Sequence, residues 1–291
     1  MQFTVVIPTM RREEILDATL ESLRQCDPAP HEVVVIDADS EGSSRPIVTA
    51  FDHQVSPAVR YLRTDPSLTR QRNSGIDDAA GDVIVFLDDD VTIEVDLFER
   101  LAEVYKDPTV VGATGRVIEP QSDRLGGPAS SVRRLLPGGG EEGTFTRYGY
   151  PRYLSDPDQP RDVEFMQGCF MSARRECAAE VRFDEHLGGY ALAEDEDFSY
   201  RLSQLGRIRY VPEIVVHHRK LGFGSQDARQ FGRRVIVNRA YLFRKNFPQT
   251  LIARLQFVWF VLALIGHRLV NREWQGARGL IDGAVQVWFR R

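Results

Sequence analysis

The chain has 291 residues, of which 42% are hydrophobic and 27% are charged. This composition excludes a largely disordered chain, and the length suits one large α/β domain or two fused halves. Three scattered cysteines are too few for a disulfide framework, so we expect reduced thiols in a cytoplasmic protein. The first apolar run is short and follows no basic leader, which agrees with a cytoplasmic location.

The net charge of −5 conceals an asymmetry along the chain. From residue 201 onward there are 17 basic and 4 acidic residues, whereas the first 200 residues hold 20 basic and 38 acidic ones. Two explanations fit: solvated surface charge, or an acidic part that holds metal cations and a basic part that faces an anionic partner. No recognised nucleic-acid-binding module accompanies the basic region, so we do not expect nucleic acid as that partner.

The first ninety residues alternate between strand and helix patterns. Strands are predicted at residues 3–7, 32–36, 60–62 and 83–87, with helical patterns at 15–23 and 68–80. This alternation predicts an α/β fold with a Rossmann-like, mostly parallel sheet flanked by helices. In such sheets ligands bind at the carboxyl ends of the strands, so the residues directly after each strand are candidate site residues.

Acidic residues follow two of these predicted strands. The residues at the strand ends are Pro8 and Thr9, Asp37 and Asp39, and Asp88, Asp89 and Asp90. Because clustered carboxylates repel one another, a metal ion or a hydrogen-bonding ligand usually accompanies such an arrangement. In an extended segment Asp88 and Asp90 point to the same side, which suits Mg²⁺ or Mn²⁺ that also binds phosphate oxygens. A chance acidic turn is the alternative.

The middle and the second half of the chain hold further candidates. Residues 135–161 form a long loop rich in glycine, proline and tyrosine, which we expect to shape a binding site. A strand is predicted around residues 168–171, and a helix begins at Glu194 and ends near Gly206. Short strands at 208–211 and 214–216 precede two histidines at a strand end, where a histidine can ligate a metal or bond a phosphate.

Asp195 lies in the first turn of the predicted helix. It shares a helix face with Phe198 and Leu202, so we expect it to point inward or into a cleft. A partly desolvated carboxylate beside a cation is a suitable general base. The alternative is that the acidic first turn only interacts favourably with the helix dipole.

The region from residue 226 is basic and predicted to be helical. Residues 255–265 are nearly all apolar, but this run is shorter than the ~20 residues that cross a bilayer. With arginines around it and aromatic residues within it, the run suits either of two arrangements. It packs on the catalytic domain, or it lies in a membrane interface.

Taken together, the motifs resemble those of family 2 inverting glycosyltransferases, which have the GT-A fold. The six matching segments are residues 5–9, 34–40, 72–75, 86–90, 168–171 and 194–197. Each is weak by itself, but six in this order are specific. The resemblance covers about residues 2–220.

The resemblance implies a domain organisation. Residues 1–220 would form the GT-A catalytic domain, with a nucleotide-sugar-binding half at 1–115 and an acceptor and catalytic half at 116–220. Residues 221–291 would form a basic helical C-terminal region that is membrane-interfacial under the second arrangement above.

The resemblance also implies roles for individual residues. Asp195 matches the catalytic base, supported by Glu194. Asp90 would be the chief ligand of Mn²⁺ or Mg²⁺, with Asp88 and His218, and His217 is the alternative histidine. The donor would be bound by Pro8, Thr9, Arg12, Asp37, Asp39, Arg72, Asn73, Asp88 and Asp89.

The implied activity is that of a metal-dependent, inverting, hexosyltransferase-type enzyme. It would move a sugar from a UDP- or dTDP-sugar to a hydroxyl of a glycan or lipid-linked acceptor in cell-surface polysaccharide synthesis. The location would be cytoplasmic, on the inner face of the cell membrane if the C-terminal region contacts it.

Two alternatives stay open. The first is a haloacid-dehalogenase-type phosphatase that uses Asp88 and Asp90. It lacks an evident downstream lysine and leaves the first-strand and Arg72–Asn73 motifs unexplained. The second is a non-catalytic nucleotide-sugar-binding protein, against which the intact acidic sets at 88–90 and 194–197 argue.

Overall fold

The computed structural model divides the chain into two compact units. One consists of Met1–Glu119 and Tyr153–Lys220, and the other of Pro120–Arg152 and Leu221–Arg291. The described residues are 1–51, 57–120, 136, 140–154, 158–188, 191–219 and 227–289. Of the loop expected at 135–161, residues 135, 137–139 and 155–157 lie outside them. The segment Pro120–Arg152 is thus grouped with the C-terminal helices, whereas the family resemblance implies a catalytic domain over residues 1–220.

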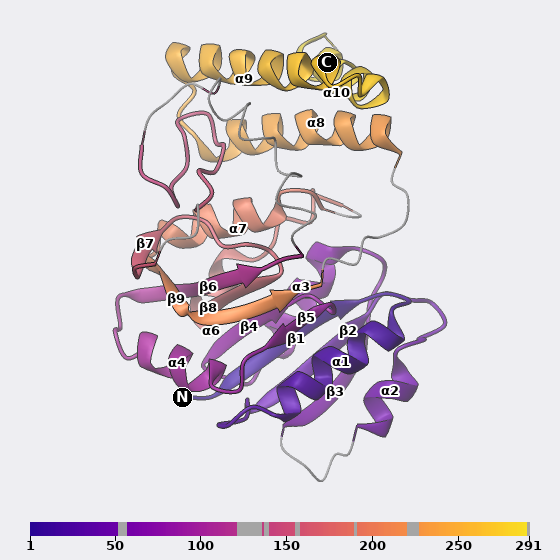
Figure 1. Ribbon diagram of the computed structural model, residues 1–291, viewed down its shortest axis with the longest axis vertical. Helices are drawn as coiled ribbons and strands as arrows, with labels where there is room; N and C mark the ends of the chain where they lie inside the picture. Colours follow the sequence, from indigo (N-terminus) through magenta and orange to yellow (C-terminus); the bar gives the residue numbers. More distant parts are fainter. Residues whose placement is uncertain are drawn as a thin grey trace. The chain divides into compact units, whose positions relative to one another are not determined.

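Within the described residues, the first unit holds a nine-stranded sheet in the order β3-β2-β1-β4-β8-β6-β9-β5, with β7 beside β9 (Figure 1). The strands are β1 Phe3–Thr9, β2 Glu32–Asp37, β3 Ala58–Arg63, β4 Val83–Leu87, β5 Val91–Ile93, β6 Val110–Ile118, β7 Arg161–Val163, β8 Phe170–Arg174 and β9 Arg207–His218. Strands β3, β2, β1 and β4 are parallel neighbours, as the sequence predicts.

The second half of the sheet is mixed rather than mostly parallel. Strand β8 lies antiparallel between β4 and β6, and β5 and β7 are antiparallel to β9. Parallel neighbours need a crossover connection of about a dozen residues. Only the three residues from Asp88 to Asp90 separate β4 from β5, so β5 pairs with β9 instead. The two short strands predicted at 208–211 and 214–216 are one strand, with a register shift near Pro212.

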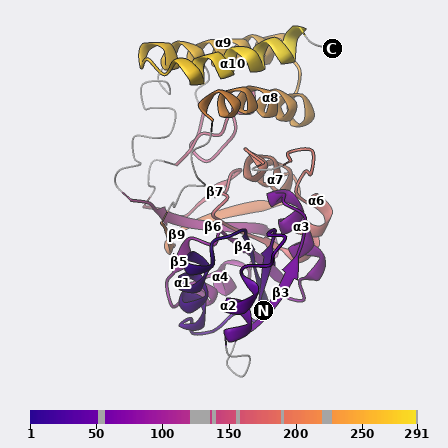
Figure 2. The same cartoon turned by 90° about the vertical axis from the view of Figure 1, so that its right-hand side faces the viewer.

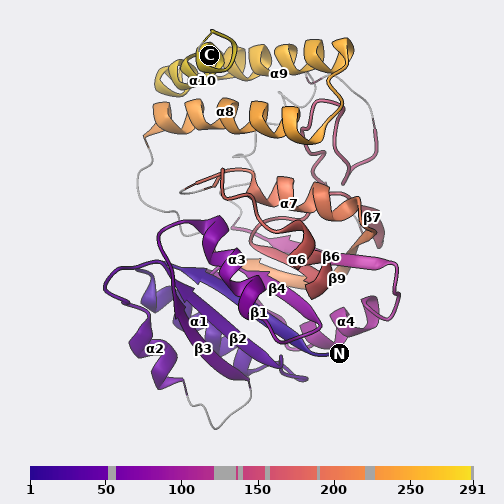
Figure 3. The same ribbon diagram turned by 180° about the vertical axis from the view of Figure 1, so that it is seen from behind.

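Helices cover both faces of this sheet. They are α1 Glu13–Arg24, α2 Arg45–Ala50, α3 Leu68–Asp78, α4 Leu97–Val104, α6 Arg175–Val181 and α7 Glu194–Ser203. In β1, Val5 and Ile7 join the core that contains residues of α1 and α4, whereas Val6 joins the core of α3, α6 and α7. Figure 3 shows α3, α6 and α7 on the face toward the viewer. Burial on both faces explains why the strands are continuously apolar.

Helix α3 lies very close to the sheet because it has a glycine at the contact. A Cβ atom on Gly75 would come within 2.3 Å of the Val6 Cγ1 atom. One turn earlier, the Gln71 side chain donates hydrogen bonds to the backbone oxygens of Thr9 and Ile36, at 2.9 and 2.7 Å. This end of α3 is therefore fixed at the carboxyl ends of β1 and β2.

The second unit contains three long helices, α8 Ala228–Asn246, α9 Leu251–Val270 and α10 Trp274–Phe289. Helix α10 packs against both α8 and α9 (Figure 2). The approach to α8 is close, since a Cβ atom on Gly279 would lie 2.1 Å from the Arg229 backbone oxygen. Tyr148 and Tyr150, from the loop before β7, pack their rings on Phe260 of α9 at centroid distances of 5.6 and 5.1 Å.

The predicted apolar run at 255–265 is part of a longer helix. Helix α9 has 20 residues. Arg254 and His267 bound the apolar run, but the helix continues past both of them. By length and composition it is the one described helix that could cross a membrane. Only 22% of the most apolar 18-residue stretch of this helix is buried in the protein.

Candidate active site

The acidic turn between β4 and β5 stands at the carboxyl end of β4. Asp89 and Asp90 are buried, at 2% and 3% exposed, whereas the Asp88 side chain is 32% exposed. The Asp88 backbone N–H donates to the Cys169 oxygen at 3.2 Å, which ties the turn to the segment before β8. Three adjacent carboxylates are thus held rigidly at one strand end.

Cations and a hydroxyl group compensate the two buried carboxylates. Arg12, just before α1, places one guanidinium nitrogen 2.8 Å from Asp89 and another 2.9 Å from Asp90. The Thr9 hydroxyl donates to Asp89 at 2.8 Å. Burial raises the pKa of Asp89 to about 7. Burial opposes ionisation of Asp90 as well, but the hydrogen bonds and charges of His218 and Arg12 lower its pKa to about 2.

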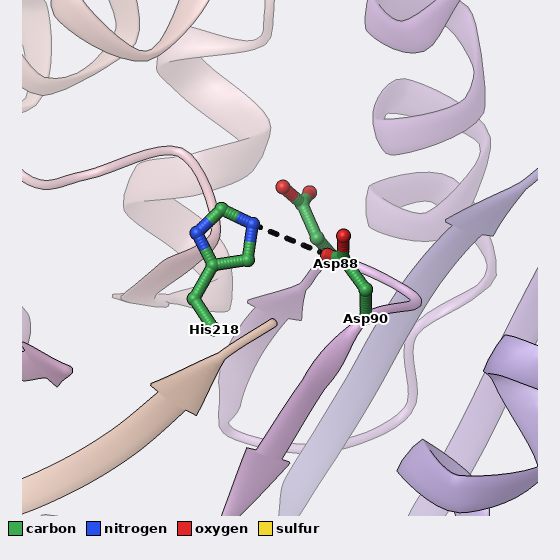
Figure 4. A group of neighbouring side chains, drawn as sticks. All are labelled: Asp88, Asp90 and His218. Atoms are coloured by element: carbon green, nitrogen blue, oxygen red, sulfur yellow. Dashed lines mark ion pairs between the residues drawn. The ribbon is translucent and has the colours of Figure 1, made fainter. Parts of the chain in front are cut away.

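His218 completes a group of possible metal ligands with Asp88 and Asp90 (Figure 4). One ligand atom from each residue lies within 4.8 Å of the others. The His218 Nε2 atom is 3.2 Å from Asp90 Oδ1. Two carboxylate oxygens and one imidazole nitrogen are a donor set that fits Mn²⁺ or Mg²⁺, with room for further ligands.

Glu119, at the end of β6, was not found by the sequence analysis. Its Oε1 atom lies 3.3 Å from the Nδ1 atom of His218, opposite the ring nitrogen that faces Asp90. A carboxylate in this place fixes the orientation of a ligating imidazole. Burial lowers the pKa of His218, but its hydrogen bonds to Asp90, Cys169 and Glu119 outweigh this and raise it to about 12.

His217, the alternative histidine, lies in a different environment. Its Nε2 atom is 2.8 Å from Glu94 and its side chain is 44% exposed. Successive side chains of a strand point to opposite sides, so only one of the two histidines meets the acidic turn. That histidine is His218.

Arg72 joins the acidic turn to the start of α7. It is 1% exposed, and its Nη1 atom lies 2.8 Å from Glu194 while its Nη2 atom lies 3.2 Å from Asp88. The Nη2 atom also donates to the Gly168 oxygen at 2.8 Å. Two acidic groups more than a hundred residues apart in the chain therefore meet at one guanidinium group.

Asp195 is partly buried beside Glu194, in the first turn of α7. It accepts hydrogen bonds from the backbone N–H groups of Gly168, at 3.0 Å, and Glu196, at 2.9 Å. Burial and the charge of Glu196 raise the pKa of Asp195. Burial and the charge of Asp195 likewise raise that of Glu194.

The backbone before α7 is strained. Ala193 has φ 72°, in the left-handed region that non-glycine residues rarely adopt. Ala191, two residues earlier, has φ 48°. Strain of this kind costs of order 1–3 kcal/mol per residue and persists where the surrounding structure enforces it, often at functional sites.

The remaining predicted donor-binding residues either make contacts within the first unit or are buried in its sheet. Asp37 accepts hydrogen bonds from Tyr61 at 3.1 Å and from the backbone of Asp39 at 2.8 Å, so it shapes its own loop. Asp39 pairs with Arg11 at 2.9 Å. The Asn73 amide both donates to and accepts from the backbone of Phe183, at 2.9 and 2.8 Å. Pro8 is buried in β1.

Comparison with known proteins places these features in a family. Residues 4–182 match the family model described as glycosyl transferase family 2. The chain is 26% identical over 239 residues to the amylovoran biosynthesis glycosyltransferase AmsB of Erwinia amylovora, which covers 78% of this chain and 72% of that protein.

Solved structures show the same fold. TarS of S. aureus, in complex with UDP-GlcNAc, has a TM-score of 0.64 at 16% identity and covers 99% of this chain and 81% of its own. The mannosyltransferase PcManGT of Pyrobaculum calidifontis, with GDP-Man and Mn²⁺, has a TM-score of 0.62 at 15% identity, with 100% and 88% covered. These likenesses confirm the GT-A fold.

We predict that Arg72→Gln destabilises the protein by ~3–5 kcal/mol, because it leaves the buried Glu194 and the partly exposed Asp88 without their shared cation. The matched control is Arg70→Gln on the same helix, whose ion pairs with Glu185 and Asp65 are exposed. Exposed pairs contribute at most ~1 kcal/mol. Urea unfolding measures both free energies, and equal losses would contradict the bridging role of Arg72.

Proposed function

This chain belongs to glycosyl transferase family 2, and we propose that it transfers a sugar from a nucleoside diphosphate to an acceptor hydroxyl with inversion at the anomeric carbon. One observation carries the proposal. Arg72 contacts Asp88, one of the possible metal ligands at the acidic turn, and Glu194, the chain neighbour of the partly buried carboxylate Asp195. An inverting transfer needs these two chemistries next to each other.

The donor we propose is a UDP- or dTDP-sugar. The fold neighbours carry UDP-GlcNAc and GDP-Man, which supports a nucleotide sugar as the donor class. Thr9, Arg12 and Asp89 lie at the strand ends where ligands of such sheets bind. Asp39, in the loop after β2, and Asn73, in α3, would bind the nucleoside, as the family resemblance implies.

The acceptor we propose is a hydroxyl of a glycan or a lipid-linked glycan in cell-surface polysaccharide synthesis, at the inner face of the cell membrane. The relative AmsB supports this because its name assigns it to the biosynthesis of a polysaccharide, amylovoran.

Asp88, Asp90 and His218 would hold Mn²⁺ or Mg²⁺. When bound, the ion would neutralise charge that develops on the leaving diphosphate. The chain's own residues prepare that site: Arg12 balances the charge of the acidic turn, and Glu119 orients the His218 ring.

Asp195 is the proposed general base. It takes the proton of the acceptor hydroxyl while that oxygen forms its bond to the anomeric carbon. The bond between this carbon and the diphosphate oxygen breaks, and its electron pair leaves with the nucleoside diphosphate. The hydrogen bonds from Gly168 and Glu196 hold the carboxylate in place, and its raised pKa suits proton abstraction.

The phosphatase alternative has less support. It requires Asp88 as a nucleophile, whereas the Asp88 carboxylate is paired with Arg72 at 3.2 Å. The family match also includes the whole Asp88–Asp90 turn. The intact acidic sets at 88–90 and 194–197, which Arg72 joins, argue against the alternative of a non-catalytic binder.

We predict that Asp195→Asn lowers kcat by ~10²–10⁴-fold, because the amide no longer accepts the proton. Binding of the nucleotide donor should persist, since the acidic turn is unchanged. Transfer assays and calorimetric titration with UDP and Mn²⁺ measure the two effects. Loss of nucleotide binding together with activity would contradict the role of base.

The pH dependence of kcat should report Asp195. The base must be ionised, so activity falls as the pH drops through its pKa, which lies above the ordinary aspartate range because of burial and Glu196. The charge of Arg72 lowers the pKa of Asp195, so the test variant keeps Arg72 unchanged. Glu196→Gln removes a negative charge, so we expect the acid limb to move to lower pH. A shift to higher pH, or none, would refute the assignment.

Two matched carboxylate–histidine pairs test the metal site. Glu119→Gln should weaken Mn²⁺ binding by ~10–100-fold, because His218 loses the partner that orients it. Glu94→Gln removes the corresponding partner of His217 and should leave the affinity unchanged. Electron paramagnetic resonance of free Mn²⁺ measures binding without turnover. Equal effects of the two variants would exclude the selective role of His218.

A further inference from the structure

All three tryptophans of the protein lie in helices α9 and α10, and all three are exposed. Trp259, Trp274 and Trp288 are 53%, 59% and 42% exposed. Tryptophan has a large apolar ring and one polar N–H group, and it is enriched where a protein meets the boundary between lipid and water. Three such side chains exposed on two neighbouring helices indicate an interaction surface.

Helix α9 has two different apolar faces. Leu251, Leu255 and Leu262 recur at helical spacing and are 73%, 61% and 56% exposed. On the opposite side, Phe257 and Phe260 are buried, and Phe257 stacks on Phe243 of α8 at a centroid distance of 5.0 Å. One face of α9 is therefore used for packing within the unit, and the other is exposed.

Helix α10 repeats this pattern. Trp274, Ile281, Val285 and Trp288 follow one another at intervals of seven, four and three residues and are all exposed. The opposite side carries Gly279, which packs on the backbone of α8. In the ribbon views α9 and α10 lie side by side on the same side of α8 (Figures 1 and 2). Since both buried sides contact α8, the exposed apolar sides of the two helices point away from it.

The charge of this region matches an anionic surface. Residues 251–289, which contain α9 and α10, hold four basic and two acidic residues, and α8 holds six further basic residues. Both acidic residues, Glu273 and Asp282, are paired, with Arg268 and Arg229. At 100° per residue, Arg254 falls along the edge of the exposed apolar stripe of α9, where its side chain can reach phosphate groups while the stripe meets acyl chains.

We propose that α9 and α10 bind the surface of an anionic phospholipid bilayer and lie parallel to its plane. The contact face consists of Leu255, Trp259, Leu262, Trp274, Ile281 and Trp288. The basic residues supply attraction to lipid phosphates, and the apolar face enters the boundary between headgroups and acyl chains. This inference does not depend on the proposed sugar transfer.

The tryptophans report on the proposal directly in the full-length protein. On vesicles of 70% POPC and 30% POPG we expect a blue shift of the intrinsic fluorescence and co-sedimentation, at least 10-fold weaker on pure POPC. Lipids brominated near the headgroup end of the chain should quench the fluorescence more than lipids brominated near its far end. This experiment needs no variant and so is independent of effects on folding.

Variants locate the surface. Leu255→Glu with Leu262→Glu should abolish co-sedimentation, because two charges would enter the apolar boundary. The matched control is Val95→Glu with Leu205→Glu. These two aliphatic residues lie in the sheet unit and are 52% and 41% exposed. The control protein should bind vesicles as the unchanged protein does.

Four results would overturn the proposal. One is absence of both the blue shift and co-sedimentation on POPG-containing vesicles. Another is loss of binding in the control variant. A third is a dimer that light scattering detects without lipid and that the Leu255 and Leu262 substitutions dissociate. This result would mean that the face binds a second copy of the chain. The fourth is equal quenching by shallow and deep bromines, with resistance to carbonate extraction, which would make α9 a spanning helix.

Discussion

A single buried guanidinium group joins the two acidic parts of the candidate active site. Arg72 contacts Asp88 after β4, Glu194 at the start of α7 and the Gly168 oxygen before β8. Removing a charge from water costs several kcal/mol, so this arrangement is stable only while the partners are all present. Because Gly75 lets α3 lie against β1, the helix delivers Arg72 to this position. Arg72 thereby ties the acidic turn to the first turn of α7, which carries Asp195.

The same principle organises the acidic turn itself. Asp89 and Asp90 are nearly inaccessible to water, yet each lies within hydrogen-bond distance of a cationic group from a distant segment, Arg12 or His218. These groups lower the electrostatic cost of gathering carboxylates and hold them in one orientation. A site organised in this way needs little rearrangement when charge develops during a reaction, which is the physical basis of electrostatic catalysis.

Much of this site follows from local sequence, but not its supporting contacts. The apolar runs and the carboxylates behind them predict the parallel half of the sheet and the positions of Asp88 and Asp90. The choice of His218 over His217 depends on the register of β9 with β5, and Glu119 depends on the pairing of β6 with β9. Those pairings join residues about a hundred positions apart, and no local pattern encodes them. For the same reason, the sequence did not indicate that Asn73 bonds the backbone of Phe183.

The packing of Tyr148 and Tyr150 on Phe260 has a consequence for the order in which the protein is made. Tyr148 and Tyr150 leave the ribosome well before α9. Their rings are therefore exposed to water while the rest of the sheet unit is synthesised. The second unit can fold only after the C-terminal helices have been synthesised. A chain stopped before Leu251 would therefore expose an aromatic surface and should aggregate, even though its sheet is complete.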